Sequence, residues 1–320
     1  MEPYVRRVLE EANDYPPQAV QSIYFGGGTP TVLPAPLLVS LLEKLRMRFP
    51  CDGEITIEAN PATVNLDSLR TLRDAGFSRI SIGVQSLHDH ELSALGRLHS
   101  AEEAVSAIRD AYHAGFSNIS ADVMFGHPAQ TVDSVSQTVR KLLSLPITHI
   151  STYSLSIEEG TAFAENHLVL PDEEAEREMY YAIRDILEKN GLIQYEISNF
   201  AKPNMKAVHN SIYWDCGEYI GLGAGAHGYV AGVRYANTEN LETYLASPSP
   251  IVSRSHLTAQ DMRDEYYMLG LRRREGVKDD GNPKIPILIQ NQLLEKDGDF
   301  VRLTKKGMDL ANYVIAELCT

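Results

Sequence analysis

Short runs rich in Ile, Val, Phe and Tyr recur along the chain, and they predict six β-strands. The segments between them carry apolar residues at helical spacing, as at Leu38, Leu41, Leu42 and Leu45. The expected strands are residues 22–25, 54–58, 79–84, 118–125, 149–157 and 194–198.

Residues that commonly cap helices mark the boundaries of several of these helical segments. Asn65 precedes a helix that we expect to end at Gly76, because glycine tolerates the left-handed backbone that closes a helix. Ser100 and Glu103 form an S-x-x-E capping box at the start of the next helix. Further helices are expected over residues 1–14, from Pro34, over 131–145 and over 172–189.

The regular alternation of strand and helix predicts crossover units and a parallel sheet. Both an open doubly wound sheet and a barrel are built in this way. A barrel collects functional residues from the carboxyl ends of most of its strands, whereas a doubly wound sheet uses one switch point. Polar or glycine residues stand at or near five successive strand ends, so we expect a barrel: Gly27, Glu58, Gln85, Asp122 and Glu158.

We expect three parts along the chain. Residues 1–205 form the barrel, and residues 206–250 form a connecting segment that contains glycine-rich and histidine-containing stretches. Residues 251–320 carry a helical pattern, a hairpin pattern and a final helix, which indicate a winged-helix-like domain. The alternative for this last part is a helical lid packed on the barrel.

The segment Gly26-Gly27-Gly28 follows the first strand directly and is itself followed by Thr29. Three glycines remove every side chain from a short length of backbone, so that its N–H and C=O groups can approach a ligand. The alternative is a plain tight turn between a strand and a helix.

Several polar side chains at the other strand ends are candidates for ligand binding. Glu58 ends a buried strand, where an unpaired carboxylate is costly, so it should bind donors such as ribose hydroxyls or pair with a helix. The same reasoning applies to Gln85 and Asp122. Arg97 follows a glycine and can clamp a carboxylate, although an isolated arginine more often forms a surface salt bridge.

His209 lies just before Ile212-Tyr213-Trp214, which contains the only tryptophan of the chain. An imidazole beside flat aromatic rings suits an axial ligand of haem iron with the macrocycle stacked nearby. The alternative is a His-Asn pair that holds a turn under a packed tryptophan.

Composition narrows the class of protein. The 320 residues carry a formal charge of −14, and no basic stripe is present to bind nucleic acid. No apolar run reaches the roughly 18 residues of a membrane span, and the charged first helix is not a signal peptide, so we expect a cytoplasmic protein. Cys51, Cys216 and Cys319 are far apart, which favours three reduced thiols.

Taken together, six motifs make this sequence similar to the radical S-adenosylmethionine (SAM) proteins related to oxygen-independent coproporphyrinogen III oxidase. Within this group, the sequence resembles the haem chaperone branch, on the motifs Gly83-Val84-Gln85-Ser86, Gly96-Arg97-Leu98-His99 and above all His209-Asn210-Ser211-Ile212-Tyr213-Trp214. The motifs are Tyr24-Phe25-Gly26-Gly27-Gly28-Thr29-Pro30, Ile57-Glu58-Ala59-Asn60-Pro61, Gly83-Val84-Gln85-Ser86, Gly96-Arg97-Leu98-His99, Asp122-Val123-Met124-Phe125-Gly126 and Tyr195-Glu196-Ile197-Ser198-Asn199-Phe200.

The resemblance implies a partial (β/α)6 barrel that binds S-adenosylmethionine. It implies that backbone groups of Gly27, Gly28 and Thr29 hold the methionine end of that molecule. It also implies that His209 binds haem and its iron, for transfer to haem-requiring acceptor proteins. The remaining pocket residues that it implies are Glu58, Gln85, Arg97 and Asp122.

The chain departs from the family at two places. Members begin with a strand and a C-x-x-x-C-x-x-C loop that holds a [4Fe–4S] cluster, and the match here starts after that loop. We therefore expect a barrel without its first strand, with Ser22–Phe25 at the sheet edge, no cluster and no reductive cleavage of S-adenosylmethionine. The second departure is His127 and Ala129, where the family usually has an aliphatic residue and a glycine.

Three hypotheses about function follow. The first is a haem chaperone that keeps an S-adenosylmethionine pocket. The second is a radical SAM enzyme, a coproporphyrinogen III oxidase of porphyrin biosynthesis, inactive without the cluster cysteines. The third is an unrelated barrel enzyme that uses Glu58 and Asp122 for acid–base catalysis.

Overall fold

The computed structural model describes residues 1–128, 130–157 and 169–319, so Ala129 and Glu158 lie outside the described residues. The chain forms two compact units, each considered by itself. Residues 1–18 group with the C-terminal part, whereas the sequence analysis assigned them to the barrel. The barrel unit is Ala19–Gln194 with Ser198–Lys206, and the C-terminal unit is Met1–Gln18, Tyr195–Ile197 and Ala207–Thr320.

The barrel unit is built on one seven-stranded sheet, in which the first five strands of the chain are parallel neighbours. The strand order is β1-β2-β3-β4-β5-β7-β6, which places β1 at one edge of the sheet, as expected. These five strands are β1 (Ser22–Phe25), β2 (Glu54–Ala59), β3 (Arg79–Gln85), β4 (Asn118–Phe125) and β5 (His149–Ser154).

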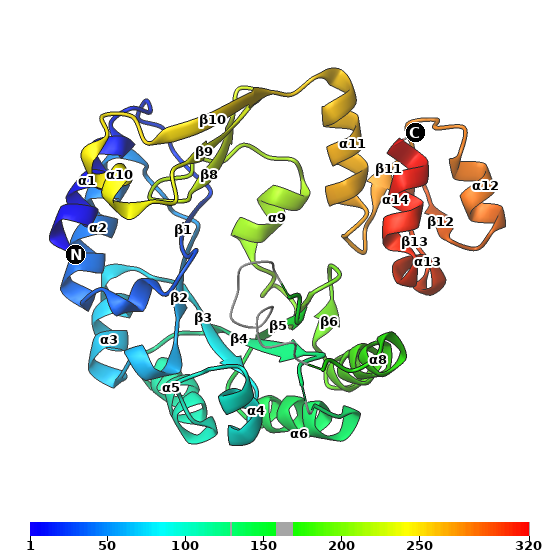
Figure 1. Cartoon of the computed structure of the whole chain (residues 1–320), viewed down its shortest axis with the longest axis horizontal. Helices are drawn as coiled ribbons and strands as arrows, with labels where there is room; N and C mark the ends of the chain where they lie inside the picture. The colour runs from blue at the N-terminus through cyan, green and yellow to red at the C-terminus, as the bar shows by residue number, and fades with distance from the viewer. Residues whose placement is uncertain (129, 158–168, 320) are drawn as a thin grey trace. The chain divides into compact units, whose positions relative to one another are not determined.

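Helices connect these strands and cover one face of the sheet (Figure 1). Asn65 accepts a hydrogen bond from the Ser68 amide, and Gly76 closes the same helix at a φ of +111°. The expected capping box of Ser100 and Glu103 is also formed. The helices are α2 (Ala35–Arg48), α3 (Leu66–Ala75), α4 (Asp89–Ala94), α5 (Ala101–His113), α6 (Val132–Leu143) and α8 (Glu173–Lys189), with short 3-10 turns η1 (Pro30–Val32) and η2 (Pro61–Thr63).

The sixth parallel strand that we expected at Gln194–Ser198 is wrong. Two short strands replace it, β6 (Ile193–Gln194) and β7 (Asn199–Ala201), and β7 runs antiparallel to β5. Between them, Tyr195–Ile197 belong to the C-terminal unit, where the Ile197 amide donates to the Arg272 carbonyl at 3.1 Å. The strand pattern is interrupted because this segment finds its backbone partners elsewhere. The fifth strand also ends earlier than expected, at Ser154.

The two faces of the barrel sheet differ in chemistry. On β3, Ile80, Ile82 and Val84 are completely buried and alternate with Arg79, Ser81, Gly83 and Gln85. Since successive residues of a strand point to opposite faces, one face packs apolar side chains and the other carries a polar row. The same alternation recurs on β4 and β5, with Ser120, Asp122, His149 and Ser151 as the polar residues.

The connecting segment contains more structure than expected. It contains helices α9 (Val208–Trp214) and α10 (Leu241–Ala246), and its strands β8 and β9 form an antiparallel sheet of order β10-β9-β8 with β10, which begins directly after the segment. The N-terminal helix α1 (Glu2–Ala12) joins this unit through Glu11, whose buried carboxylate accepts from Gly223 N at 2.9 Å, Asn237 Nδ2 at 2.6 Å and Tyr244 Oη at 2.5 Å. The strands are β8 (His227–Val230), β9 (Val233–Asn237) and β10 (Ile251–His256).

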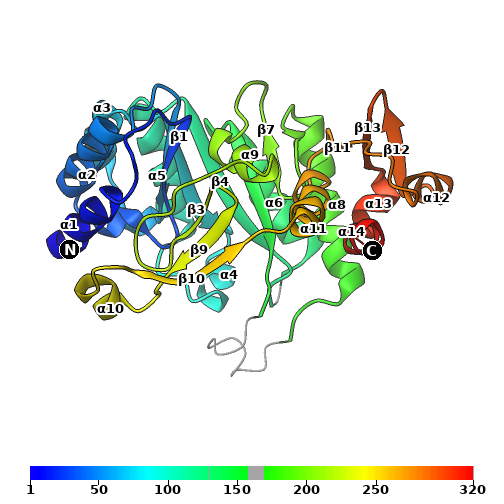
Figure 2. The same cartoon turned by 90° about the horizontal axis from the view of Figure 1, so that it is seen from above.

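The last part of the chain has its own apolar core and the element order of the expected winged-helix-like domain. Its three-stranded sheet has the order β11-β13-β12, and β12 and β13 form the expected hairpin (Figure 2). The core includes Tyr267, Leu288, Val301 and Val314. The elements are α11 (Ala259–Gly270), β11 (Val277–Lys278), α12 (Ile285–Gln290), β12 (Leu294–Asp297), β13 (Phe300–Leu303), α13 (Lys305–Asp309) and α14 (Ala311–Cys319).

Candidate functional site

The glycine segment after β1 combines close packing with open space. A Cβ atom on Gly26 would lie 2.3 Å from Tyr24 Cε1 and 2.9 Å from the Glu58 carboxyl group, so no side chain fits there. Gly27 has a φ of +88°, and a Cβ atom on Gly27 or Gly28 would meet nothing within 4 Å. The backbone of these two residues is therefore open to a ligand. The Thr29 carbonyl begins η1 by accepting from the Val32 amide at 3.0 Å.

Glu58 fastens this segment to the neighbouring strand. Its carboxylate accepts a hydrogen bond from Tyr24 Oη at 2.5 Å and another from the Gly27 amide at 3.2 Å. Burial and the nearby Glu58 charge raise the pKa of Tyr24 far above its usual value. Tyr24 consequently remains a donor, and the Glu58 carboxylate is held at the mouth of the barrel beside the glycines.

Asp122 lies on β4, where its Oδ1 accepts a hydrogen bond from Ser81 Oγ at 2.9 Å. Burial raises the pKa of Asp122 to about 6, although the Ser81 hydrogen bond and the Arg79 charge act in the opposite direction and Glu58 adds to the rise. Asp122 therefore titrates close to neutrality, and it changes there from a hydrogen-bond donor to a pure acceptor.

Gln85 ends β3 in the left-handed region, with a φ of +66°, and its side chain is buried. A Cβ atom on Gly83 would lie 3.0 Å from Gln85 Nε2, so the amide folds back over that glycine. A non-glycine residue in this conformation at a strand end is a strained position of the kind that clusters at binding sites.

Arg97 follows α4 in a half-exposed position, and its amide donates to the Leu92 carbonyl at 2.9 Å. The nearby His99 ring is buried and contacts the Val84 carbonyl through Nε2 at 3.1 Å, which anchors this loop to the end of β3. The structure thus joins Gly27 with Glu58 directly and brings Asp122 into their electrostatic surroundings. Arg97 is connected to the pocket through its loop alone.

Sequence reasoning missed the polar residues that support this pocket. The motif that contains Tyr24 assigns it no role, and the sequence gives no sign that Arg79, Ser81, Ser120 and His149 are more than strand residues. The available signal was their spacing, because each occupies an alternate position on a strand whose other residues are apolar.

His209 lies on α9 in the C-terminal unit. Its Nε2 atom is 2.7 Å from Tyr213 Oη, one helical turn further on, and the two rings meet edge to face at 5.0 Å between centroids. Tyr213 in turn packs edge to face on Tyr219, at 4.6 Å. No residue of α9 is fully buried, so this aromatic group lies at a partly open surface.

Two arginines border the same aromatic group. The Arg272 guanidinium lies over the Trp214 ring, 4.9 Å from its centroid, and the buried indole N–H has no acceptor in the described part of the chain. Arg234 donates to Tyr219 Oη at 3.1 Å and forms a two-point ion pair with Glu265. The arrangement offers flat apolar faces with cationic groups at the border.

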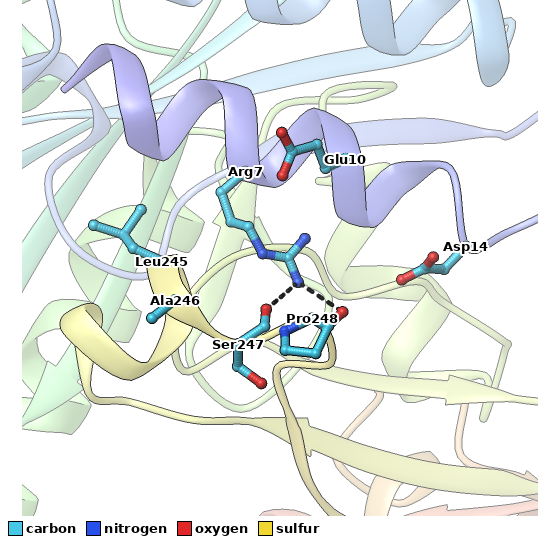
Figure 3. Close-up of a pocket in the computed structure, with 7 residues that line it drawn as sticks. All are labelled: Arg7, Glu10, Asp14, Leu245, Ala246, Ser247 and Pro248. Atoms are coloured by element: carbon cyan, nitrogen blue, oxygen red, sulfur yellow. Dashed lines mark hydrogen bonds between the residues drawn. The ribbon is translucent and has the colours of Figure 1, made fainter.

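A shallow pocket of the C-terminal unit lies beside Arg7 of α1 (Figure 3). The buried guanidinium of Arg7 donates to the carbonyls of Tyr244 at 3.3 Å, Ser247 at 3.2 Å and Pro248 at 3.4 Å. Its donors are used to hold the turn that follows α10, which is a structural role.

Residues 1–128, 130–157 and 169–319 contain neither a group of metal-ligating side chains nor a membrane-spanning helix. Within these ranges, no group of three or more His, Cys, Asp or Glu side chains is placed to hold a metal ion. No helix of the same ranges has the length and apolar character that crossing a bilayer requires.

Comparison with known proteins decides the family. Residues 2–142 match the model of the radical SAM superfamily. The heme chaperone HemW of Lactococcus lactis is 35% identical, over 97% of this chain and 88% of the relative. The protein of the same name from Escherichia coli is 32% identical, over 98% of this chain and 88% of the relative. This chain belongs to the HemW family of radical SAM proteins. The resemblance drawn from the motifs is confirmed.

A solved structure supports the fold of this HemW family member. The structure titled coproporphyrinogen III oxidase (HemN) from Escherichia coli, a radical SAM enzyme, matches with a TM-score of 0.83 and 20% identity. The match covers 99% of this chain and 81% of the other. The predicted α/β radical SAM fold is confirmed, and at this identity the likeness shows the fold alone.

Proposed function

We propose that this protein is a haem-binding chaperone that carries haem at His209 and transfers it to haem-requiring proteins. The observation that carries the proposal is the identity of 32% or more to several heme chaperones HemW over most of both chains. The likeness to coproporphyrinogen III oxidase concerns the fold, so the oxidase hypothesis has no comparable support.

The surroundings of His209 fit haem. Haem needs an axial ligand for iron, apolar faces for the macrocycle and cations for its propionates. His209 supplies an imidazole at a half-exposed position, Tyr213 and Trp214 supply rings, and Arg272 supplies a cation. The buried Trp214 N–H, which has no acceptor in the described part of the chain, can donate to a bound carboxylate. If haem iron bound at Nε2 of His209, it would replace the contact of that nitrogen with Tyr213 Oη.

The barrel pocket fits S-adenosylmethionine. That molecule carries an amino group, a carboxylate and ribose hydroxyls, which require both acceptors and donors. The Glu58 and Asp122 carboxylates are acceptors, and the open backbone of Gly27 and Gly28 supplies close-approach donors and acceptors. Together with an iron–sulfur cluster, S-adenosylmethionine supplies radical chemistry. We assign this chain the binding role only, with Thr29, Gln85 and Arg97 completing the pocket.

A titration with hemin tests the haem proposal. The parent protein should give a shifted Soret band that saturates at one haem per chain, and His209→Ala should lose at least ten-fold in affinity because the axial ligand is removed. His227→Ala is a matched control, since His227 is an exposed histidine of the same unit and is expected to bind as the parent does.

Equal haem binding by the parent and His209→Ala would show that another residue holds the iron. The chaperone step itself requires transfer. Apo-forms of haem-requiring enzymes should gain activity from the haem-loaded parent faster than from the His209→Ala variant supplied with the same hemin. The recipients and the cytoplasmic location are part of the proposal.

A further inference from the structure

A second polar layer lies inside the barrel, closer to the amino ends of the strands than Asp122. It consists of Arg79 on β3, Ser120 on β4 and His149 on β5, all of them at most 2% exposed. Ser120 and His149 are direct partners across β4 and β5. The His149 Nδ1 atom lies 2.8 Å from Ser120 Oγ and 3.4 Å from Arg79 Nη2.

Arg79 brings a full positive charge into this layer. A buried charge is costly unless other groups compensate it. Among the described residues Arg79 makes no direct ion pair, and its Nε atom has no hydrogen-bond partner there. Burial, together with the Arg79 charge, holds the pKa of His149 well below its usual range, so the imidazole is neutral and adds no second cation.

The negative groups that feel this charge are the pocket carboxylates. Arg79 acts electrostatically on Asp122, and it also acts on Tyr24, which is hydrogen-bonded to Glu58. The register places Glu58 opposite Ser81, two residues beyond Arg79 on the same face of β3. A single buried cation therefore stands behind the two acidic residues of the pocket.

We propose that Arg79 is a positioning residue, whose buried charge holds Asp122 in the form that accepts hydrogen bonds from ligand hydroxyl groups. This inference rests on the S-adenosylmethionine pocket proposed above. A carboxylate accepts hydrogen bonds only, whereas a protonated carboxyl group also donates and presents a weaker acceptor. Arg79 thereby sets the pH range in which the pocket binds a nucleoside.

Every element packed around Asp122 contributes to its titration. Glu58 on β2 favours the protonated form of Asp122, while Arg79 and Ser81 on β3 and Ser151 on β5 favour the ionised form. Because the pKa of Asp122 is about 6 with Arg79 present, loss of the Arg79 charge moves it upward, toward or above neutrality. Nucleoside affinity at pH 7 should then fall, and it should recover as the pH rises.

Calorimetry tests this with two probes, S-adenosylmethionine and 5′-deoxyadenosine, between pH 5.5 and 8.5. The parent should bind with constant affinity above about pH 7, because Asp122, with a pKa of about 6, is ionised there. Arg79→Met should bind at least ten-fold more weakly at pH 7, with its pH midpoint raised by about one unit or more. Arg79→Lys keeps the charge and should restore most of the parental profile. Arg70→Met, at an exposed arginine of α3, is the matched control.

A parental pH profile in folded Arg79→Met would overturn the inference. A second measurement separates this from failure of the pocket itself. The Asp122 carboxyl signal, followed by carbon NMR in the ligand-free parent and in Arg79→Lys and Arg79→Met, reports its ionisation without any ligand. An unchanged midpoint in Arg79→Met contradicts the role of Arg79, whether or not the probes bind. A shifted midpoint with no probe binding by the parent supports that role and overturns the pocket instead. Should Arg79→Met fail to fold, a loss of the parental midpoint in Arg79→Lys would contradict the role of its charge.

Discussion

The proposed S-adenosylmethionine pocket of the barrel and the proposed haem site on α9 are built from the chain in opposite ways. In the pocket, the hydrogen-bonded partners are far apart in sequence, with 34 residues between Tyr24 and Glu58 and 41 between Ser81 and Asp122. On α9, His209 meets Tyr213 four residues later. A site built from separate strands is inseparable from the fold, whereas a site on one helix can change while the fold remains. Substitutions of the hydrogen-bonded residues in the barrel should therefore alter stability. Substitutions on α9 should alter ligand binding alone.

The largest change in the free energy of unfolding is expected at the buried contact of His127 and Glu91. Both side chains are fully buried, with Nε2 and Oε2 3.5 Å apart, and Ser86 Oγ donates to the same carboxylate at 2.5 Å. His127→Leu leaves the carboxylate without this partner and should lower the free energy of unfolding by about 3 kcal/mol. Urea unfolding at pH 7 measures the change, with His113→Leu at an exposed position as the control.

The same contact has a pH signature. Burial opposes ionisation of Glu91, but His127, Ser134 and Ser86 together hold the pKa of Glu91 at about 2. Because this pKa is lower in the folded state than the value near 4.3 of an unfolded chain, its stabilisation is present above pH 4.3 and is lost as the pH falls toward 2. In His127→Leu the folded-state pKa of Glu91 should rise toward about 4.3, so the loss should be smaller and should be complete at a higher pH. Identical acid unfolding curves would show that His127 does not stabilise the carboxylate.

Asp122→Asn should raise the free energy of unfolding, whereas His127→Leu should lower it. The pKa of Asp122 is about 6 in the folded state, above its value near 3.9 in an unfolded chain, so its ionisation destabilises the fold as the pH rises from 4 through 6. The variant should be more stable than the parent by about 2 kcal/mol at pH 8 and similar to it at pH 4. Thermal unfolding at both values checks this, and an equal difference at both would argue against ionisation as the cause.

A pair of glycine variants separates packing from open space. Gly26→Ala places a methyl group against Tyr24 and Glu58 and should destabilise the barrel unit by about 1–2 kcal/mol. Gly28→Ala meets nothing within 4 Å and should leave the unfolding midpoint unchanged, while it narrows the space for a ligand. Similar unfolding midpoints for the two variants would contradict the close packing at Gly26.

The smallest changes in ligand affinity and in stability are expected for a substitution on α9. Tyr213→Phe removes the hydroxyl that contacts His209 Nε2. If iron binds at that nitrogen, the variant no longer has to break a hydrogen bond worth about 1 kcal/mol, so haem should bind up to about five-fold more tightly. The unfolding midpoint should not move by more than about two degrees. Weaker haem binding in this variant would mean that the Tyr213 hydroxyl contributes to the site.

Local signals predicted most of the elements of the barrel unit. The β1 strand and the start of α3 follow from residues that act within a few positions, such as the cap at Asn65 and the left-handed Gly76. The strand-end residues Gly27, Glu58 and Asp122 were recognisable because parallel strands gather their carboxyl ends at one edge.

The features that could not be predicted depend on distant partners. The segment between β6 and β7 has a good strand pattern, yet its Ile197 amide donates to the Arg272 carbonyl and its Tyr195 carbonyl accepts from the Arg274 amide. The burial of the Arg79 charge could not be predicted from the sequence either, since an arginine at the start of a strand is usually exposed. Only the register of β3 with β4 and β5 shows that it lies inside.

The order in which the chain is synthesised limits when the carboxylate of Glu11 can form its hydrogen bonds. Its partners Gly223, Asn237 and Tyr244 follow 212 to 233 residues later. At about 5–20 residues per second, a ribosome needs roughly ten to fifty seconds to deliver them. The strands of the barrel, which run from Ser22 to Ala201, are all synthesised within that interval. The barrel strands are therefore available for pairing before α1 can form the hydrogen bonds of Glu11 within its own unit.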